Sequence, residues 1–520
     1  MNTNKKIILA SAITLATMQT NAIPFAPTDA RAMAMGGTGV ASARTVHAVQ
    51  FNPSLLSTAK KDDDFGLLLP QVSAYGSDED DFIESSEDFS DASYEDNFND
   101  AVKGIEDPLN KILENLETIK AADSLSDSDR LIAIKGATDS LDINTRELVS
   151  GTDSLDIARD ELSKGLASLS NKALRGGIGI GTGLAIPSRK FSAALSMSSS
   201  VNFSGQLNVS ESDLNILEAY TQGTQAYSNT LATFTAASKE VSDILDNMTN
   251  GDSSRASELT AANTELKTAE TNLDNFQYGT TNGTAGNDIF DEGKLAADAD
   301  NLELDSTVEI IAVSISEAAL SFSREFNIKG HDVAFGISPK MQRIDVYDYI
   351  ISVEDDVEGS DISDYGVDKT SFNLDIGAST QFGFEDRGHV GIVAKNLLSQ
   401  TLTSINGQTV KIAPQLRAGV AYEAWGWLNL AADLDLIEND PIAYEDSTQF
   451  IGLGAEADVH GFMQIRLGLR SNLAASDQEV ASLGLGLSPF GLFHIDIGAY
   501  ANVNDPKNEL GAAMELGIDW

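Results

Sequence analysis

The last residues of the chain alternate between apolar and polar positions with a period of two. One face of the corresponding strand carries only apolar side chains: Trp520, Ile518, Leu516, Met514, Ala512 and Leu510. The other face carries small and charged residues, including Glu515 and Glu509. Since successive side chains of a strand point to opposite faces, this pattern is typical of a lipid-facing terminal strand of an outer-membrane barrel. A single segment of this kind also fits an ordinary half-buried strand.

The same alternation recurs upstream, and its recurrence favours the barrel. Polar, charged or glycine residues return at every second position, as in 461–470, where Gln464, Arg466, Gly468 and Arg470 alternate with apolar side chains. The predicted strands are 65–75, 176–186, 190–205, 307–324, 331–346, 370–383, 389–397, 414–424, 427–436, 449–458, 461–470, 479–487, 491–500 and 509–520. The sequence therefore predicts an all-β transmembrane barrel over 61–520, with about 14 antiparallel strands.

The connections between these strands alternate in length. Short turns are predicted at 187–189, 327–330, 385–388, 425–426, 460–461 and 489–491. Long connections are predicted at 76–175, 206–306, 347–369, 398–413, 437–448, 471–478 and 501–508. Bacterial barrels have short periplasmic turns and long external loops, whereas a soluble β-sandwich has no reason to keep its long loops on one side. The long connections are therefore predicted to be extracellular.

The long connection 76–175 is predicted to be a helical extracellular insertion. It opens with an acidic run from Asp78 to Asp100 that contains no Lys or Arg, which is typical of a solvated, mobile segment. Asp107 and Pro108 then predict the start of a helix, as N-cap and first-turn proline. A heptad stripe follows and requires a partner helix, as in a coiled coil: Ile134, Leu141, Leu148, Leu155, Leu162 and Leu169. The segment 138–143 repeats as 152–157 within it.

The connection 206–306 predicts a second helical insertion. Apolar residues at helical spacing from Leu214 to Met248 predict one helix, and a turn is expected at 250–252. Leu259, Leu266 and Leu273 then predict a return helix. Two extracellular helical hairpins are thus expected, either as a lid that buries its own apolar stripes or as a device that binds a partner.

The N-terminus predicts export. Lys5 and Lys6 precede a short apolar run that ends before Ala22, so residues 1–22 are predicted to be a signal peptide. The segment 23–60 is longer than a simple leader needs. It contains Gly36, Gly37 and Gly39, and glycines let a backbone approach a barrel wall closely. We expect this segment to be a plug within the barrel; the alternative is a flexible periplasmic leader.

Composition then excludes several function classes. Against 79 acidic residues stand 34 Lys and Arg, which gives a formal charge of −45 and excludes a nucleic acid as a natural partner. The chain contains no Cys, so disulfides, thiolate metal sites and cysteine nucleophiles are excluded. The five histidines are too scattered to form a metal motif, and no phosphate-binding loop occurs. No cofactor and no metal site are predicted.

Charged residues on the inward-facing positions of the strands predict a polar network in the lumen. Its predicted members are Arg417, Asp433, Asp435, Arg466, Arg470, His494 and Asp496. His494 lies two residues before Asp496 on one strand, and we expect an ordinary hydrogen bond there rather than a catalytic pair. The chain is therefore predicted not to be an enzyme.

The glycine-rich stretch 36–39, followed by Asn52 and Pro53, resembles the N-terminal region of the long-chain fatty-acid transporter family (FadL/TodX). It is also similar to the outer-membrane family of conjugal transfer protein TraF, and more distantly to PorV-type barrels. The first resemblance implies a 14-stranded barrel with an N-terminal plug whose turn Asn52 and Pro53 would fix. It also implies a lateral exit through a distorted strand, for which the serine-rich segment 196–200 of the third strand is the candidate. The two helical insertions depart from that family's pattern.

These features predict an outer-membrane barrel, in contact with outer-membrane lipid, that takes up or captures a hydrophobic small molecule. The glycines together with Asn52 and Pro53 are the candidate ligand and plug residues. The alternative is a surface component of conjugation or secretion machinery, in which the helices bind a cell-surface protein partner and the barrel is only an anchor.

Overall fold

The computed structural model describes residues 29–58, 65–121, 126–248, 255–281, 284–292, 294–295, 305–353, 365–439, 444, 447–476, 478–489 and 492–519. The chain divides into two compact units. The first consists of Met1–Ile83, Asn171–Leu207 and Val308–Trp520, and the second of Glu84–Ser170 and Asn208–Thr307. The predicted signal peptide and the predicted turn at 250–252 lie outside the described residues.

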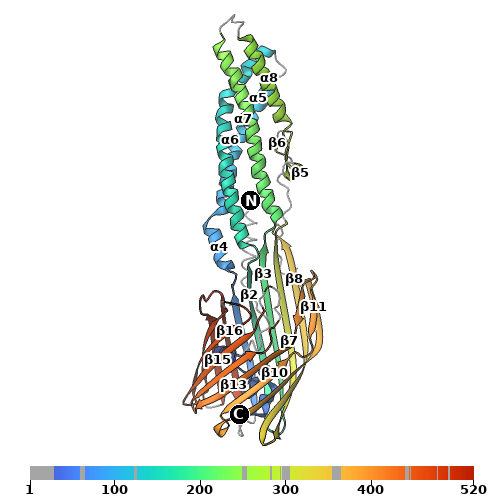
Figure 1. Ribbon diagram of the computed structural model, residues 1–520, viewed down its shortest axis with the longest axis vertical. Coiled ribbons are helices and arrows are strands. Elements are labelled where there is room, and N and C mark those ends of the chain that lie inside the picture. The colour runs from blue at the N-terminus through green and yellow to red at the C-terminus, as the bar shows by residue number, and fades with distance from the viewer. Residues whose placement is uncertain are drawn as a thin grey trace. The chain divides into compact units, whose positions relative to one another are not determined.

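Fourteen antiparallel strands close into a barrel in the first unit (Figure 1). They are β1 (Gly66–Ser77), β2 (Ala173–Ile186), β3 (Ser192–Asn208), β7 (Thr307–Ile328), β8 (His331–Ser352), β9 (Gly366–Phe382), β10 (Gly388–Lys395), β13 (Gln415–Trp425), β14 (Leu428–Asp435), β15 (Phe450–Val459), β16 (Met463–Asn472), β17 (Val480–Leu487), β18 (Phe493–Asn502) and β19 (Glu509–Asp519). The first and last strands close the barrel, with Gly66 opposite Asp519 and Ser77 opposite Glu509. The predicted strands and their number are confirmed, although β7 and β8 extend beyond their predicted ends.

The outward face of the barrel is apolar and the inward face is polar. Leu467 and Leu483 point outward and are each 62% exposed, whereas Arg466 and Glu515 point inward and are fully buried. Outward leucines, isoleucines and phenylalanines recur on nearly every strand of the barrel. A continuous apolar surface of this extent is stable in hydrocarbon rather than in water, so the barrel spans a membrane. No helix among the described residues is long and apolar enough to cross a bilayer.

Short and long connections alternate around the barrel, as predicted. The short ones join β2 to β3, β7 to β8, β9 to β10, β13 to β14, β15 to β16, and β17 to β18. Several place their residues at positive φ, including Lys329, Gly330, His460 and Gly461. We call the two ends of the barrel the short-connection end and the long-connection end.

Along its pairing with β2 the third strand shows no distortion. β3 pairs with β2 in unbroken register from Gln206 to Ala193, through the serine-rich segment. Register shifts occur between Glu423 and Trp425 of β13, and in β1, which shifts against both neighbours just beyond Leu68. Pro70 lies at this point and has no N–H to donate to a ladder, which explains the break.

The second unit contains four long helices that pack around one apolar core (Figure 1). They are α5 (Tyr94–Ala121), α6 (Asp127–Leu169), α7 (Glu211–Asn247) and α8 (Ala256–Asp274). The shorter helix α4 (Phe82–Asp91) precedes them, and a small sheet of β4 (Tyr278–Thr281), β5 (Thr284–Asp291) and β6 (Lys294–Leu295) follows them. The helices predicted at 214–248 and around 259–273 are confirmed.

The expectation of a mobile acidic run and of a helix start at Asp107 is wrong. The run contains α4 and the beginning of α5, and Pro108 lies inside α5. Ile105 and Ile112, on either side of the proline, are both buried in the helical core. Their burial stabilises the helix by more than the hydrogen bond that the proline removes. This tertiary contribution is not visible in local sequence pattern.

The heptad stripe is buried as predicted. All six of its members are at most 9% exposed, and four of them lie in the core shared with α5 and α7. The small residues of α6 permit close approach: a Cβ at Gly165 would lie 2.6 Å from the ring of Tyr94. Outside the stripe, Ile143 and Ile157 are 57% and 62% exposed, each at the end of one copy of the repeat.

Two short strands were not predicted within the connection 396–414. β11 (Gln400–Thr403) and β12 (Thr409–Ile412) form a hairpin that pairs Gln400 with Ile412 and Thr403 with Thr409. The alternation over four residues is too short to be separated from a loop by sequence alone.

We predict that Leu141→Ala destabilises the helical unit by about 3 kcal/mol, because it leaves a cavity at a fully buried position of the core. Thermal unfolding of the full-length protein in detergent, followed by circular dichroism at 222 nm, measures this. Ile143→Ala is the control, since it removes an exposed side chain of the same helix. Equal losses of helical stability in the two variants would contradict the assignment of the core.

Candidate functional site

Residues 29–58 form an N-terminal helical segment that lies inside the barrel. It consists of α2 (Ala30–Ala34), η1 (Thr45–His47), α3 (Ala48–Phe51) and η2 (Pro53–Ser57). Side chains cap the N-termini of two of these helices. Asp29 caps α2 by accepting a hydrogen bond from Ala32 N at 2.8 Å, and Asn52 caps η2 by accepting one from Ser54 N at 3.1 Å. The helices contact strands all around the barrel, including β1, β2, β8, β9 and β16 to β19. The segment therefore occupies the lumen.

The predicted glycine and asparagine residues lie where the backbone of this segment turns or is closely packed. Gly36 and Gly37 have φ values of +67° and +77°, which residues with a side chain rarely adopt. A Cβ at Gly39 would lie 2.2 Å from the Phe51 ring. Asn52 is fully buried and donates to the carbonyls of Val40 at 3.0 Å and Ala378 at 3.4 Å. Asn52 thus ties two parts of the segment to each other and to β9.

Glycines of the barrel wall receive the segment. A Cβ at Gly468 would lie 2.1 Å from Gly36 N, and one at Gly336 would lie 2.3 Å from the Pro53 carbonyl carbon. Similar clashes with the segment would occur at Gly377, Gly391, Gly452, Gly454, Gly484 and Gly498. Glycines on seven strands therefore form a bed into which the backbone of the segment fits.

A chain of buried ion pairs joins the segment to the wall. Arg31 of α2 makes a bidentate contact with Glu456 at 2.8 and 3.0 Å. Glu456 also accepts from Arg466 at 2.7 Å, and Arg466 contacts Asp496. Asp496 in turn accepts from Arg44 of the segment at 2.7 Å. This chain begins and ends on the segment and passes through strands β15, β16 and β18.

A second group of predicted lumen residues binds backbone rather than side chains of the segment. Asp433 accepts from the N–H groups of Gly39 at 2.8 Å and Val40 at 2.9 Å. Arg417 pairs with Asp435 at 2.6 Å. These contacts fix the turn that follows the glycine-rich stretch.

The two remaining members of the predicted network are Arg470 and His494. Arg470 lies apart from these groups, whereas His494 interacts electrostatically with Arg44, Asp496 and Arg466 of the ion-pair chain. Arg470 pairs with Glu509, and its guanidinium lies over the rings of Phe450 at 4.6 Å and Tyr500 at 4.9 Å. His494 is 5% exposed, and its ring fills the space beside Gly517. The structure therefore brings the predicted residues into the lumen but divides them into separate clusters.

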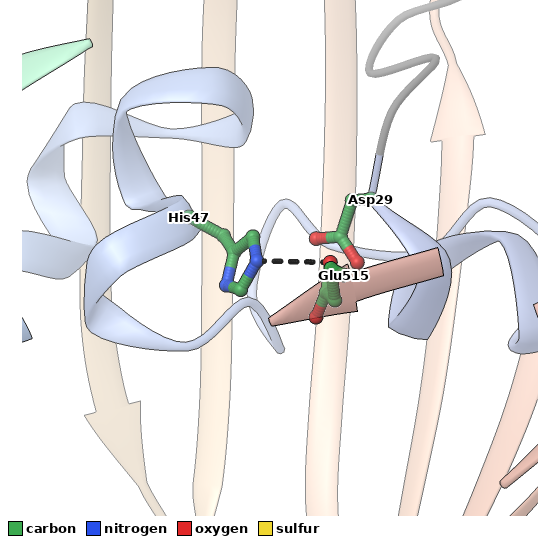
Figure 2. Close-up of side chains that lie close together, drawn as sticks. All are labelled: Asp29, His47 and Glu515. Carbon is green, nitrogen blue, oxygen red and sulfur yellow. Dashed lines mark hydrogen bonds and ion pairs between the residues drawn. The ribbon is translucent and has the colours of Figure 1, made fainter. Parts of the chain in front are cut away.

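Sequence reasoning did not identify Arg31, Arg44 and His47 as part of the network. Burial by itself would lower the pKa of His47, but the carboxylates of Glu515 and Asp29 outweigh it and raise the pKa to about 9. His47 Nε2 lies 3.2 Å from Glu515 Oε2, and Asp29 lies beside them (Figure 2). The available signal was the presence of three cationic side chains in a short, otherwise apolar stretch of a strongly acidic chain.

A polar cavity of about 940 Å³ lies between the segment and the short-connection end of the barrel. Arg31 and Arg44 of the segment line it on one side. Charged residues of the short connections and adjacent strand ends line the other side, including Glu385, Arg387 and Asp458. The segment therefore faces a hydrated, charged compartment at this end.

The lumen near the long-connection end carries an apolar patch instead. Ile311, Val313 and Ile315 of β7 and Ile344 and Val346 of β8 are each at most 4% exposed. The hairpin β11–β12 covers them with Val410 and Ile412. We call this cluster the lumenal apolar patch. It differs from the rest of the lining, which is mostly serine, glycine and charged residues.

A closed, even-stranded barrel with an apolar outer face and a filled polar lumen defines an outer-membrane β-barrel protein. The chain belongs to the family described as "F plasmid transfer operon, TraF, protein", whose pattern matches residues 49–435. No curated protein matches the chain.

Solved structures that are similar to this chain include the Ralstonia pickettii toluene transporter TbuX. It has 9% sequence identity and a TM-score of 0.44, and the match covers 95% of this chain and 99% of that one. The P. putida toluene transporter TodX has 9% identity and a TM-score of 0.42, with coverage of 95% and 99%. The CymD monoaromatic hydrocarbon channel has 9% identity and a TM-score of 0.41, with coverage of 95% and 97%. The fold assignment rests on the strand register and not on these likenesses.

We predict that Gly468→Ala displaces the N-terminal helical segment, because the new Cβ would meet Gly36 and Met35 backbone atoms at 2.1 and 2.4 Å. The chain lacks Cys, so a single thiol placed by Met35→Cys, at a fully buried position, reports the displacement. Maleimide labelling is expected to be faster in M35C/G468A than in M35C. In the control M35C/G183A the nearest atom to the new Cβ is 3.5 Å away, so labelling should stay slow. Equal labelling in all three proteins would contradict the fit.

Proposed function

We propose that this protein is an outer-membrane conduit for hydrophobic small molecules, in which the N-terminal helical segment is a movable plug. The observation that carries this proposal is the lumenal apolar patch, which lies near the long-connection end of a lumen that is otherwise polar. The β11–β12 hairpin covers the patch, so in this proposal a hydrophobic molecule that enters from that end reaches these side chains when the hairpin moves aside, before it meets the segment.

The attachment of the segment supports a plug that moves. It is held by hydrogen bonds and ion pairs, and there is no Cys in the chain to form a covalent link. Buried ion pairs contribute little net stability, because their desolvation opposes their attraction, but they fix the position of the groups they join. A plug held in this way has a defined closed position without a large free energy of attachment. In this proposal the long connections are extracellular and the polar cavity faces the periplasm.

Locking the segment to the wall should abolish transport. Ser54 of η2 and Ser379 of β9 are buried, and their hydroxyl oxygens lie 2.8 Å apart. The S54C/S379C variant is therefore suited to a disulfide that ties the plug to the barrel. We predict that entry of the hydrophobic dye N-phenyl-1-naphthylamine into cells carrying the oxidised variant falls to the rate of cells without the protein. Reduction with dithiothreitol should restore it.

The control is S321C/S338C, in which the thiols join β7 to β8 and leave the segment free. Its oxidised form should pass the dye at the wild-type rate. Wild-type entry through oxidised S54C/S379C would show that the segment need not move. Equal entry in cells with and without the wild-type protein would reject the transport function itself.

A second candidate function is binding of a cell-surface protein through the helical unit, with the barrel as anchor. The observation that favours it is the exposure of Ile132, Ile143 and Ile157 on α6, at 66%, 57% and 62%. Their spacings of 11 and 14 residues place them on one face of the helix. Two of them, Ile143 and Ile157, occupy equivalent positions of the internal repeat. The repeat therefore places an apolar residue twice at an exposed position outside the helical core.

We predict that Ile143→Lys with Ile157→Lys lowers the frequency of plasmid transfer between cells, because charged residues would interrupt this apolar face. Ser140→Lys with Ser154→Lys is the matched control, since it adds the same charge at exposed, equivalent positions of the same repeat. The amount of protein in the outer membrane is measured in parallel. Unchanged transfer in the isoleucine variant, at equal protein levels, would count against this second function.

A further inference from the structure

Three side chains that are far apart in the sequence converge between the N-terminal helical segment and the barrel wall (Figure 2). Asp29 caps α2, His47 ends η1, and Glu515 points inward from β19. Their exposed fractions are 2%, 0% and 0%. One donor atom from each lies within 4.8 Å of the others. Oxygen and imidazole nitrogen donors thus meet at one buried point.

The two carboxylates at this point have no arginine or lysine in direct contact, although Arg31 interacts electrostatically with Asp29. Among the described residues, neither Asp29 nor Glu515 forms an ion pair with a lysine or arginine. Their hydrogen bonds come from Ala32 N to Asp29, from Ala30 N to Glu515 at 3.2 Å, and from His47. A protonated His47 supplies at most one positive charge against two carboxylates. By contrast, the nearby Glu456 lies between two arginines.

Two polar atoms of the cluster also lack a hydrogen-bond partner. They are Glu515 Oε1 and His47 Nδ1, both fully inaccessible. Leaving such atoms unsatisfied in a buried site costs free energy, as does leaving a buried carboxylate without a cation. The cluster therefore has too little positive charge and contains two polar atoms without a hydrogen-bond partner.

A divalent cation would supply the missing charge, since its two positive charges balance two carboxylates and leave the imidazole neutral. An imidazole nitrogen among the donors favours zinc-like transition metals over magnesium and calcium, which prefer oxygen ligands alone. Bonds of about 2.0–2.2 Å require the donors to close to roughly 3.5 Å from one another. Since the donors now lie within 4.8 Å of one another, rotations of the three side chains would have to supply this closure, and a water molecule would complete a tetrahedral site.

We propose that Asp29, His47 and Glu515 bind a divalent transition-metal ion that clamps the N-terminal helical segment to strand β19. Two of the ligands come from the segment and one from the wall, so the metal is a link between them. Asp29 and His47 also bracket the glycine-rich stretch, so one ion fixes both ends of this part of the segment. The site does not depend on which molecule, if any, passes through the barrel.

The test uses the full-length protein in detergent, purified with a tag that contains no histidine, stripped with EDTA and dialysed. Zn²⁺ binding is measured by calorimetry and by elemental analysis, and Co²⁺ is added as a spectroscopic probe of the ligands. We expect one Zn²⁺ per chain and a higher unfolding temperature when it is bound, since the ion binds only the folded site. D29N, H47Q and E515Q should each weaken binding by about 100-fold or more.

The variants are chosen to preserve the fold. Asn in place of Asp29 is an equally good helix N-cap, and Gln in place of Glu515 has the same shape. H331Q changes the exposed first residue of β8, and E385Q changes an exposed residue of the connection between β9 and β10. Both are matched controls and should bind Zn²⁺ as the wild type does. Wild-type protein that binds no stoichiometric Zn²⁺, or E515Q that binds it with wild-type affinity, would overturn the proposal. Co²⁺ absorption that is unchanged by H47Q would do the same.

Discussion

The buried ion-pair chain from Arg31 through Glu456, Arg466 and Asp496 to Arg44 is the interaction on which the arrangement of the lumen depends. It joins the N-terminal helical segment to three strands of the wall. The charges of Glu456, Arg466 and Asp496 are removed from water, so each needs its partner in place, and removal of one would leave another uncompensated. The lumen therefore has one well-defined packing of segment against wall, although the net free energy of the pairs is small.

The glycines of the wall make this packing sterically possible. A barrel of fourteen strands has room for more than the side chains of its own lining, and that room is filled here by backbone. Glycine at the inward positions of β8, β9, β10 and β15 to β18 lets the segment lie directly against the strands. The glycines give the wall a shape that fits the N-terminal helical segment, and the ion pairs fix the orientation of the segment. Both are needed because the segment contains only short helices with little stability of their own.

Different physical constraints govern the second unit. Its helices bury a shared apolar core, and the heptad stripe of α6 supplies a continuous row of that core. Most inward-facing residues of the barrel are polar, whereas the inward-facing residues of the helices are apolar. The strands of the barrel are held by backbone hydrogen bonds between neighbours, so the barrel can have a polar interior. The helices depend on the packing of apolar side chains against one another. This difference explains why α5 tolerates Pro108 in its interior, whereas Pro70 breaks the register of β1.

The strands, their inward and outward faces, the alternation of connections and the buried stripe of α6 were all determined by the sequence alone. These features follow from periods of two and of seven, which are local properties of the chain. Only the tertiary structure decided the start of α5, because the burial of Ile105 and Ile112 depends on contacts with other helices. The break in β1 and the hairpin β11–β12 have local causes, Pro70 and alternations of only four residues, whose signal in the sequence is too weak to be recognised.

The candidate site divides in the same way. Inward charges such as Arg417 and Asp496 were predicted from strand parity, but their partners were not. Arg31 meets Glu456 and His47 meets Glu515 across more than 400 positions of sequence. Residue spacing in the sequence cannot predict contacts over such a distance, because these residues are brought together by the closure of the barrel around the segment.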